Sequence, residues 1–175
     1  MAGVPHVFAW GGLHGAIPKY HGEGWFVNVD VASYYPSLML VYKWLSRNVH
    51  DPSKYAEIYH TRLKLKAEKN PMQQPYKIVL NSTYGAMKDK HNAMYDPRQA
   101  NNVCVGGQLL LLDLIERLED HCEIIQSNTD GILVKLRRYE DFEMLDDLCW
   151  EWEQRTGMCL EFDEFQKVYQ KDVNN

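Results

Sequence analysis

Two aspartates lie where the neighbouring residues could bring their carboxylates together. Asp30 lies at the end of the apolar, strand-like run "GWFVNVDV". Asp130 lies in "IIQSNTDGILVKL", where two β-prone runs flank Ser-Asn-Thr-Asp-Gly, a pattern that predicts a β-hairpin turning at or near residues 128–131. Converging carboxylates repel each other unless a cation lies between them, and oxygen ligands of this kind suit Mg2+. The alternative is that Asp130 only makes the turn, because Asn, Asp and Gly are favoured in turns.

The elements predicted around these aspartates are of mixed type. Setting aside a helical pair at residues 53–85 leaves the order strand, helix, hairpin, helix, strand. This order is the split β-α-β plan of ferredoxin-like folds, so we expect an α+β fold in which an antiparallel sheet is backed by helices. The first strand and the hairpin are neighbours in that plan, which would place Asp30 beside Asp130. The individual segments expected are a hairpin at 6–17, a strand at 25–31, helices over 36–45, 53–70, 73–85, 102–120 and 139–157, and strands at 158–165 and 165–171.

The composition is that of a globular protein. The chain has 175 residues, of which 45% are hydrophobic and 25% charged, and this suits one domain with a real core. No apolar run approaches the roughly 20 residues of a membrane span, and the N-terminus lacks the pattern of a signal peptide. The four cysteines show no zinc-binding spacing, which favours reduced thiols in a cytoplasmic protein, and the lack of a long apolar run argues against a membrane partner.

Charge is distributed unevenly along the chain. The net charge is −5, yet residues 42–98 carry 11 Lys or Arg against 5 Asp or Glu, whereas residues 113–164 carry 5 against 16. A chain polarised in this way could hold a phosphate-rich ligand at one end and cations at the other. Two solvated helical faces are the simpler explanation of the same pattern.

Three stretches carry a resemblance to family B DNA polymerases. "DVASYYPS" resembles motif A, usually DxxSLYPS; "KIVLNSTYG" resembles motif B, KxxxNSxYG; and "SNTDG" resembles motif C, usually YGDTDS, in degenerate form. They follow the order of the family and lie on the element types that the family uses. The resemblance covers residue 24 onward, looks closest to phage or prophage enzymes with short fingers, and implies a palm (residues 1–52 and 86–175) with fingers helices at 53–85.

The resemblance implies template-directed addition of dNTPs to a primer 3′ end, with primer–template DNA and dNTPs as partners. The catalytic Asp30 and Asp130 would bridge two Mg2+ ions, which Mn2+ could replace, and the carbonyl of Val31 would be a further ligand. The ring of Tyr35 would exclude a 2′-hydroxyl, with Tyr84 packing near it. Asp163 or Glu164 would supply a further acidic group near the metals. The residues implied to contact the nucleotide are Ser33, Tyr34, Tyr35, Arg62, Lys66, Lys77, Asn81 and Tyr84.

Two features depart from the family pattern. Asn128 replaces the first Asp of motif C and Gly131 its Ser, so the motif has one negative charge fewer. The chain is also far shorter than a working enzyme of the family, which suggests an excised fragment or a truncated gene lacking the exonuclease and thumb, in a bacterial or phage-infected cell.

Two other functions are compatible with the sequence. The first is a catalytically inactive palm module that binds nucleotide or DNA. The second is an α+β interaction domain whose acidic end binds protein, which would bind neither Mn2+ nor nucleotide. The oligomeric state cannot be inferred.

Overall fold

The computed structural model describes residues 2–170, which form two compact units. The first unit contains the residues up to 34 and those from 104 onward, and the second contains residues 35–103. The division into residues 1–52, 53–85 and 86–175 made from the motifs stays a prediction. No helix among the described residues has the length and apolar character needed to cross a membrane.

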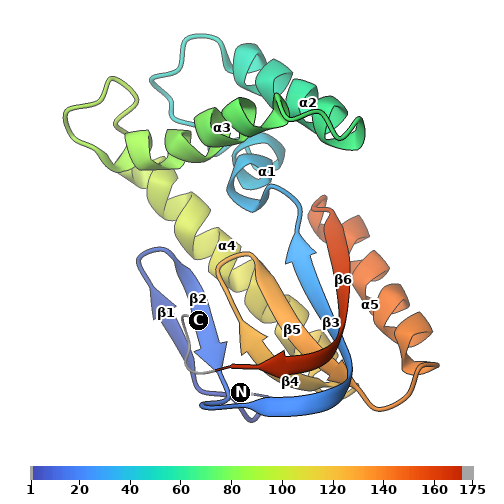
Figure 1. Ribbon diagram of the computed structural model, residues 1–175. Coiled ribbons are helices and arrows are strands. Elements are labelled where there is room, and N and C mark those ends of the chain that lie inside the picture. The colour runs from blue at the N-terminus through green and yellow to red at the C-terminus, as the bar shows by residue number, and fades with distance from the viewer. Residues whose placement is uncertain (1, 171–175) are drawn as a thin grey trace. The chain divides into compact units, whose positions relative to one another are not determined.

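The first unit is built on one antiparallel sheet of six strands in the order β1-β2-β4-β5-β3-β6 (Figure 1). Without the N-terminal β1–β2 hairpin, the order β4-β5-β3-β6 is the ferredoxin-like arrangement expected from the sequence. The fold class α+β is therefore confirmed. The strands are β1 (His6–Ala9), β2 (Gly12–Ala16), β3 (His21–Val31), β4 (Glu123–Ser127), β5 (Gly131–Leu136) and β6 (Leu160–Tyr169).

The alternation along β3 gives the two faces of the sheet different characters. Val27, Val29 and Val31 are buried in the core. Asn28 and Asp30 alternate with them and therefore point to the opposite face. One strand thus supplies both the core of this unit and an acidic group on the other face.

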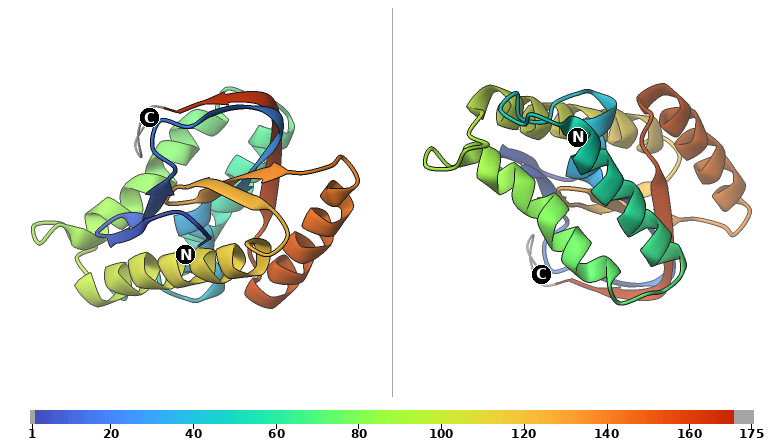
Figure 2. Two further views of the ribbon diagram at one scale, coloured as in Figure 1. Left: turned by 90° about the horizontal axis from the view of Figure 1, so that it is seen from below. Right: turned by 90° about the horizontal axis from the view of Figure 1, so that it is seen from above.

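Helices cover the core face of the sheet, as Figure 2 shows from below. They are α5 (Asp141–Thr156) and the part of α4 (Pro97–Leu118) that belongs to this unit. Trp152 is fully buried, and its Nε1 donates a hydrogen bond to the carbonyl of Leu110 at 3.2 Å, which ties the two helices together. Gly157 ends α5 in the left-handed conformation, with φ of 70°, as its position in the sequence predicts.

The second unit is helical. It contains α1 (Tyr34–Val41) from Tyr35 onward, α2 (Pro52–Ala67), α3 (Gln73–Lys88) and the first part of α4. Asp51 is the N-cap of α2, because its side chain accepts a hydrogen bond from the backbone N–H of Ser53 at 3.1 Å. α2 and α3 pack as a pair, and the hydroxyl of Tyr55 donates to the carbonyl of Leu80 at 3.1 Å.

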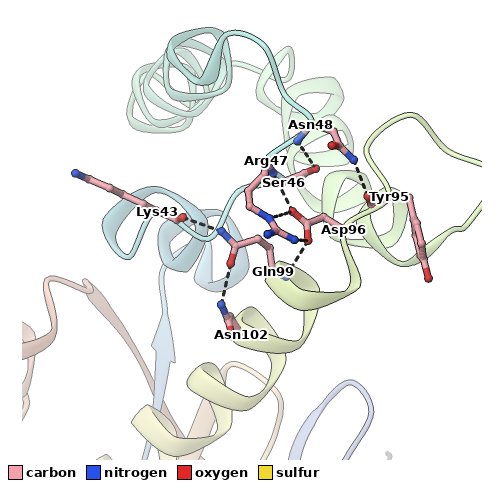
Figure 3. Close-up of polar contacts among 8 residues, drawn as sticks. All are labelled: Lys43, Ser46, Arg47, Asn48, Tyr95, Asp96, Gln99 and Asn102. Atoms are coloured by element: carbon pink, nitrogen blue, oxygen red, sulfur yellow. Dashed lines mark hydrogen bonds and ion pairs between the residues drawn. The ribbon is translucent and has the colours of Figure 1, made fainter.

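A buried carboxylate joins two loops of the second unit (Figure 3). Asp96 accepts hydrogen bonds from the backbone N–H, Nε and Nη2 of Arg47 at 3.0, 2.9 and 2.8 Å. The side chain of Asp96 is only 2% exposed, and the guanidinium holds the pKa of this carboxyl well below its usual range. Asp96 also accepts from the backbone N–H of Gln99 at 3.3 Å, so it caps the start of α4 as well.

Some element boundaries differ from those predicted. α1 ends at Val41 rather than continuing toward residue 45, α3 runs three residues past Gly85, and α4 begins at Pro97. The two strand-like segments after α5 form the single strand β6. Asp96-Pro97 is a cap followed by a favoured first-turn residue, and this start signal was missed.

Candidate active site

Asp30 and Asp130 lie next to each other at one end of the sheet. Asp30 is paired with Gly131, which directly follows Asp130. The backbone N–H of Val31 donates to the carbonyl of Asp130 at 2.7 Å, and the N–H of Asn128 donates to the carbonyl of Gly131 at 2.8 Å. The second bond closes the turn where the sequence predicts it. The "SNTDG" segment therefore forms the predicted turn, and the same turn brings Asp130 close to Asp30.

The carboxylate of Asp30 lies in an environment that disfavours its charge. Burial raises its pKa to about 6 from an ordinary value of 3.8, and the negative charges of Asp130, Asp163 and Glu161 add to the rise. The side-chain amide of Asn28 donates to Oδ2 of Asp30 at 2.6 Å and partly offsets these effects. A cation at this place would relieve the repulsion and favour the ionised form.

Strand β6 brings a further acidic group to the same face. Asp163 pairs with Asn28, whereas Glu164 pairs with Val27. Paired residues share a face of the sheet, so Asp163 lies on the face of Asp30 and Glu164 on the core face. Of the two candidates left open by the sequence, the register favours Asp163.

Gly131 is in close contact with Asp30. A β-carbon at this position would overlap Oδ1 of Asp30 and would lie 2.9 Å from its Cγ. The serine usual in motif C could therefore not occupy this position without moving the Asp30 side chain. The departure from the family pattern at residue 131 thus matches the local packing of this chain.

The donor set fits a hard divalent cation. Among residues 2–170, no three His, Cys, Asp or Glu side chains are grouped closely enough to form a metal site by themselves. Asp30 and Asp130 nevertheless offer carboxylate oxygens, and Val31 adds a backbone carbonyl at the same end of β3. Oxygen ligands in small number suit Mg2+, which keeps several waters and uses substrate phosphates as further ligands.

The segment after Val31 turns sharply into α1. Ser33 has a left-handed backbone, with φ of 50°, and the helix begins at Tyr34. Tyr34 is buried, and its hydroxyl donates to the carbonyl of Gly107 at 2.6 Å. The Tyr34 side chain is therefore part of the core, and only its backbone N–H can serve the predicted contact with a triphosphate.

The other predicted nucleotide contacts lie in the second unit. The rings of Tyr35 and Tyr84 are in edge contact, with centroids 4.6 Å apart and planes at 65°, as the resemblance implies. Residues 77, 81 and 84 fall on one face of α3, and residues 62 and 66 on one face of α2. Arg62 is buried, whereas three of the predicted contact residues are exposed: Lys66, Lys77 and Asn81. Their binding roles stay predictions.

Two residues beside the Asp30 carboxylate, one amide and one acid, were not identified from the sequence alone. Asn28 orients Asp30, and Glu161 pairs with Asp30 in the sheet. The alternation of β3 could have pointed to Asn28, because residues two apart on a strand share a face. Glu161 required the pairing register of β6, which no local pattern provides.

Comparisons with known proteins agree with the resemblance carried by the motifs. No family model matches the chain. Over 97 residues the sequence is 29% identical to DNA polymerase II of Escherichia coli strain K12, a match that covers 54% of this chain and 12% of that protein. The structure is similar to that of the family B DNA polymerase from the hyperthermophilic archaeon Pyrobaculum calidifontis, with a TM-score of 0.62 and 18% identity over 91% of this chain and 27% of that chain. The chain therefore spans only a small part of the length of these relatives, and the two matches support a relationship to family B DNA polymerases.

Proposed function

From this relationship to family B DNA polymerases, we propose that the chain is the palm and fingers region of a DNA-directed DNA polymerase. The reaction is the template-directed addition of dNTPs to a primer 3′ end. The observation that carries the proposal is the placement of Asp30 and Asp130 side by side at the end of β3 and the β4–β5 turn. Two divalent ions, Mg2+ or Mn2+, would supply charge neutralisation on the triphosphate and orient the attacking hydroxyl.

The residues of the first unit would hold the reacting groups. Asp30 and Asp130 would bind the cations, with the carbonyl of Val31 as a further ligand. Asn28 keeps the Asp30 carboxylate in one orientation, because its amide donates to Oδ2 while Oδ1 lies against Gly131. Asp163 adds negative charge on the same face. The backbone N–H groups at the start of α1, those of Ser33, Tyr34 and Tyr35, would meet phosphate oxygens.

The residues of the second unit would bind the incoming nucleotide. Arg62 would bind phosphate oxygens through its planar fork, and Lys66 and Lys77 as point charges. Tyr35, supported by the ring of Tyr84, would exclude a ribose 2′-hydroxyl. Asn81 would border the nascent base pair. Primer–template DNA and dNTPs are the partners that follow, and a cytoplasmic location in a bacterial or phage-infected cell stays a prediction.

Nucleotide binding by the isolated chain tests the proposal. We expect weak binding of a fluorescent dATP analogue in the presence of Mn2+ and loss of that binding in EDTA. Asp130→Asn should weaken the Mn2+-dependent binding at least about tenfold, a change of roughly 1.4 kcal/mol. Asp147→Asn, at an exposed site on α5, is the matched control and should leave it unchanged. Equal binding with Mn2+ and with EDTA would contradict the two-metal mechanism.

A catalytically inactive nucleotide- or DNA-binding palm is the second candidate. The observation that favours it is Asn128, a neutral residue where motif C usually has its first Asp. The full-length gene product distinguishes the two functions in a primer-extension assay. Mn2+-dependent binding of dATP without extension of a matched primer would favour the inactive module, and extension would favour the polymerase.

A further inference from the structure

A second candidate binding site lies at the opposite end of the strands that carry the two aspartates. Trp25 pairs with Leu136, whereas Asp30 pairs with Gly131, so the two ends are separated by roughly 17 Å along β3. A cavity of about 670 Å³ opens at this end, within the first unit. A second cavity of about 460 Å³ shares part of its wall. The lining of the larger cavity includes two aromatic residues and three cations: Trp25, Tyr139, Lys135, Arg137 and Arg138.

Aromatic rings form one wall of this cavity. The rings of Trp25 and Tyr139 are in contact, with centroids 3.9 Å apart and planes at 35°. The ring of Phe142 lies nearly parallel to that of Trp25, with the ring centroids 6.2 Å apart and the planes at 13°. Tyr139 is 72% exposed, so it offers a ring to a ligand although its neighbour is anchored. Such a supported, accessible ring is a platform on which a nucleobase can stack.

The loop that carries the exposed ring is held in place. The backbone N–H of Arg138 donates to the Asp141 carboxylate at 3.0 Å, and the N–H of Phe142 donates to the carbonyl of Tyr139 at 3.1 Å. These bonds connect residues 138–142 to the start of α5. The platform is therefore formed before a ligand binds, which lowers the entropy lost on binding.

Positive charge gathers beside the rings. Within residues 2–170, Lys135, Arg137 and Arg138 form no ion pair, and Nζ of Lys135 lies 5.4 Å from the centroid of the Phe26 ring. Of the two carboxylates that line the cavity, Glu23 already pairs with Lys167 at 2.7 Å, which leaves Glu123. Two further carboxylates lie near: Glu164 lines the smaller cavity, and Asp141 accepts the backbone N–H of Arg138. Within the lining of the larger cavity, three cations against one carboxylate left without an ion pair still favour an anion, in a chain whose net charge is −5.

We propose that this cavity binds a single strand of nucleic acid, with backbone phosphates on the two arginines and a base on Tyr139. Cations that follow the backbone beside rings that take the bases are the physical elements of sequence-independent single-strand binding. An acidic peptide would use the cations but has no need of the exposed ring. The site contains none of the residues assigned to dNTP addition, and it requires no metal.

Fluorescence anisotropy with 5′-fluorescein-labelled (dT)12 in EDTA tests the proposal, because EDTA removes any binding that depends on divalent metal. Tyr139→Ala should raise the dissociation constant for (dT)12 at least about fivefold, which corresponds to the loss of one stacked base. Arg138→Ala should weaken binding and reduce the slope of log K against log salt by about 1, as expected for one lost phosphate contact.

Matched controls come from equally exposed residues elsewhere. Trp10 is 79% exposed in the β1–β2 turn, and Arg98 is an exposed arginine of the second unit. Trp10→Ala and Arg98→Ala should leave the affinity for (dT)12 within about twofold. Circular dichroism of all four variants should match the parent chain, because each altered side chain is exposed.

Three results would overturn the inference. They are undetectable (dT)12 binding by the parent chain, equal weakening by the control and cavity variants, and a poly-glutamate peptide that binds as tightly as (dT)12 with no effect of Tyr139→Ala. The last result would make the cavity an acidic-peptide site. Loss of Mn2+-dependent dATP binding with (dT)12 binding intact would instead contradict only the polymerase function.

Discussion

Replacing Asp30 by Asn should stabilise this protein at alkaline pH while removing its proposed activity. The carboxylate is partly buried and lies among other negative charges, which raise its pKa to about 6. The native state therefore binds a proton at this site more tightly than the unfolded chain does, because in the unfolded chain the pKa of Asp30 is close to 3.8. The stability that the protonated group contributes is fully present below about pH 4 and is lost as the pH rises through about 6. Asn cannot ionise, and its carbonyl can still accept the hydrogen bond from Asn28.

The size of the effect follows from the difference between the two pKa values. A rise from 3.8 to about 6 corresponds to roughly 3 kcal/mol between the fully protonated and fully ionised limits. Part of this loss occurs below pH 5, because the Asp30 carboxyl of the unfolded chain is already ionised there, and partial solvation of the side chain reduces the effect further. We therefore expect the free energy of unfolding to lose about 1 kcal/mol from Asp30 between pH 5 and pH 8. Asp30→Asn should thus gain about 1 kcal/mol over the parent at pH 8 compared with pH 5.

Urea unfolding of the parent, Asp30→Asn and the surface control Asp147→Asn at both pH values measures this difference. Mn2+ at 100 times its dissociation constant should add about 2.7 kcal/mol to the parent at pH 8 and much less to Asp30→Asn. The reasoning would be refuted if Asp30→Asn differed from the parent by the same amount at pH 5 and pH 8. It would also be refuted if Mn2+ stabilised both proteins equally.

Three further predictions follow from individual contacts. Gly131→Ala should force the Asp30 carboxylate aside at a cost of about 1 kcal/mol and abolish Mn2+-dependent dATP binding. In an Asp30→Ala background most of the stability cost should disappear, and only the 3.2 Å contact with the Val29 carbonyl would remain; additive costs in a double-mutant cycle would contradict the clash. Asp96→Asn should lower the free energy of unfolding by about 1.5–3 kcal/mol at pH 7 and less at pH 3, because the lowered pKa of Asp96 means that its stabilisation is lost as the pH falls; urea midpoints that shift equally at both pH values would contradict the role of its charge beside Arg47. Tyr35→Ala in the full-length gene product should raise ribonucleotide incorporation at least about tenfold with dNTP incorporation retained, and unchanged discrimination in a primer-extension assay would exclude Tyr35 as the sugar gate.

The sequence contained enough information to place the two aspartates because local and topological signals agreed. The turn at Asn128–Gly131 is fixed by residues that favour turns, and β5 must lie beside β3 once the chain follows the ferredoxin-like plan. The contact between Tyr35 and Tyr84 was available only from the family resemblance, since the two residues lie on different helices far apart in the sequence.

Other features depended on long-range pairing that no local pattern contains. The choice of Asp163 over Glu164 is decided by the register of β6 against β3, and a shift of one residue would exchange them. Arg47 and Asp96 are 49 positions apart, and each looks like an ordinary surface charge in the sequence. The burial of the Tyr34 side chain follows from its packing against α4, which no local pattern shows; the predicted contact of its backbone N–H with a triphosphate stays a prediction.

Register is also what allows one strand to serve both stability and chemistry. Six consecutive residues of β3, Trp25 to Asp30, pair with β5 without a bulge, whereas the irregularities lie between Glu23 and Phe26 against β6 and between Ile124 and Gln126 in β4. A slip of one residue would bury the Asp30 carboxylate in the core and expose the valines, at a cost of several kcal/mol for each exchanged pair. Burial of Val27, Val29 and Val31 on the core face therefore keeps Asp30 opposite Gly131. The repulsion that raises the pKa of Asp30 is tolerated because hydrophobic burial on the other side of the same strand opposes any shift that would relieve it.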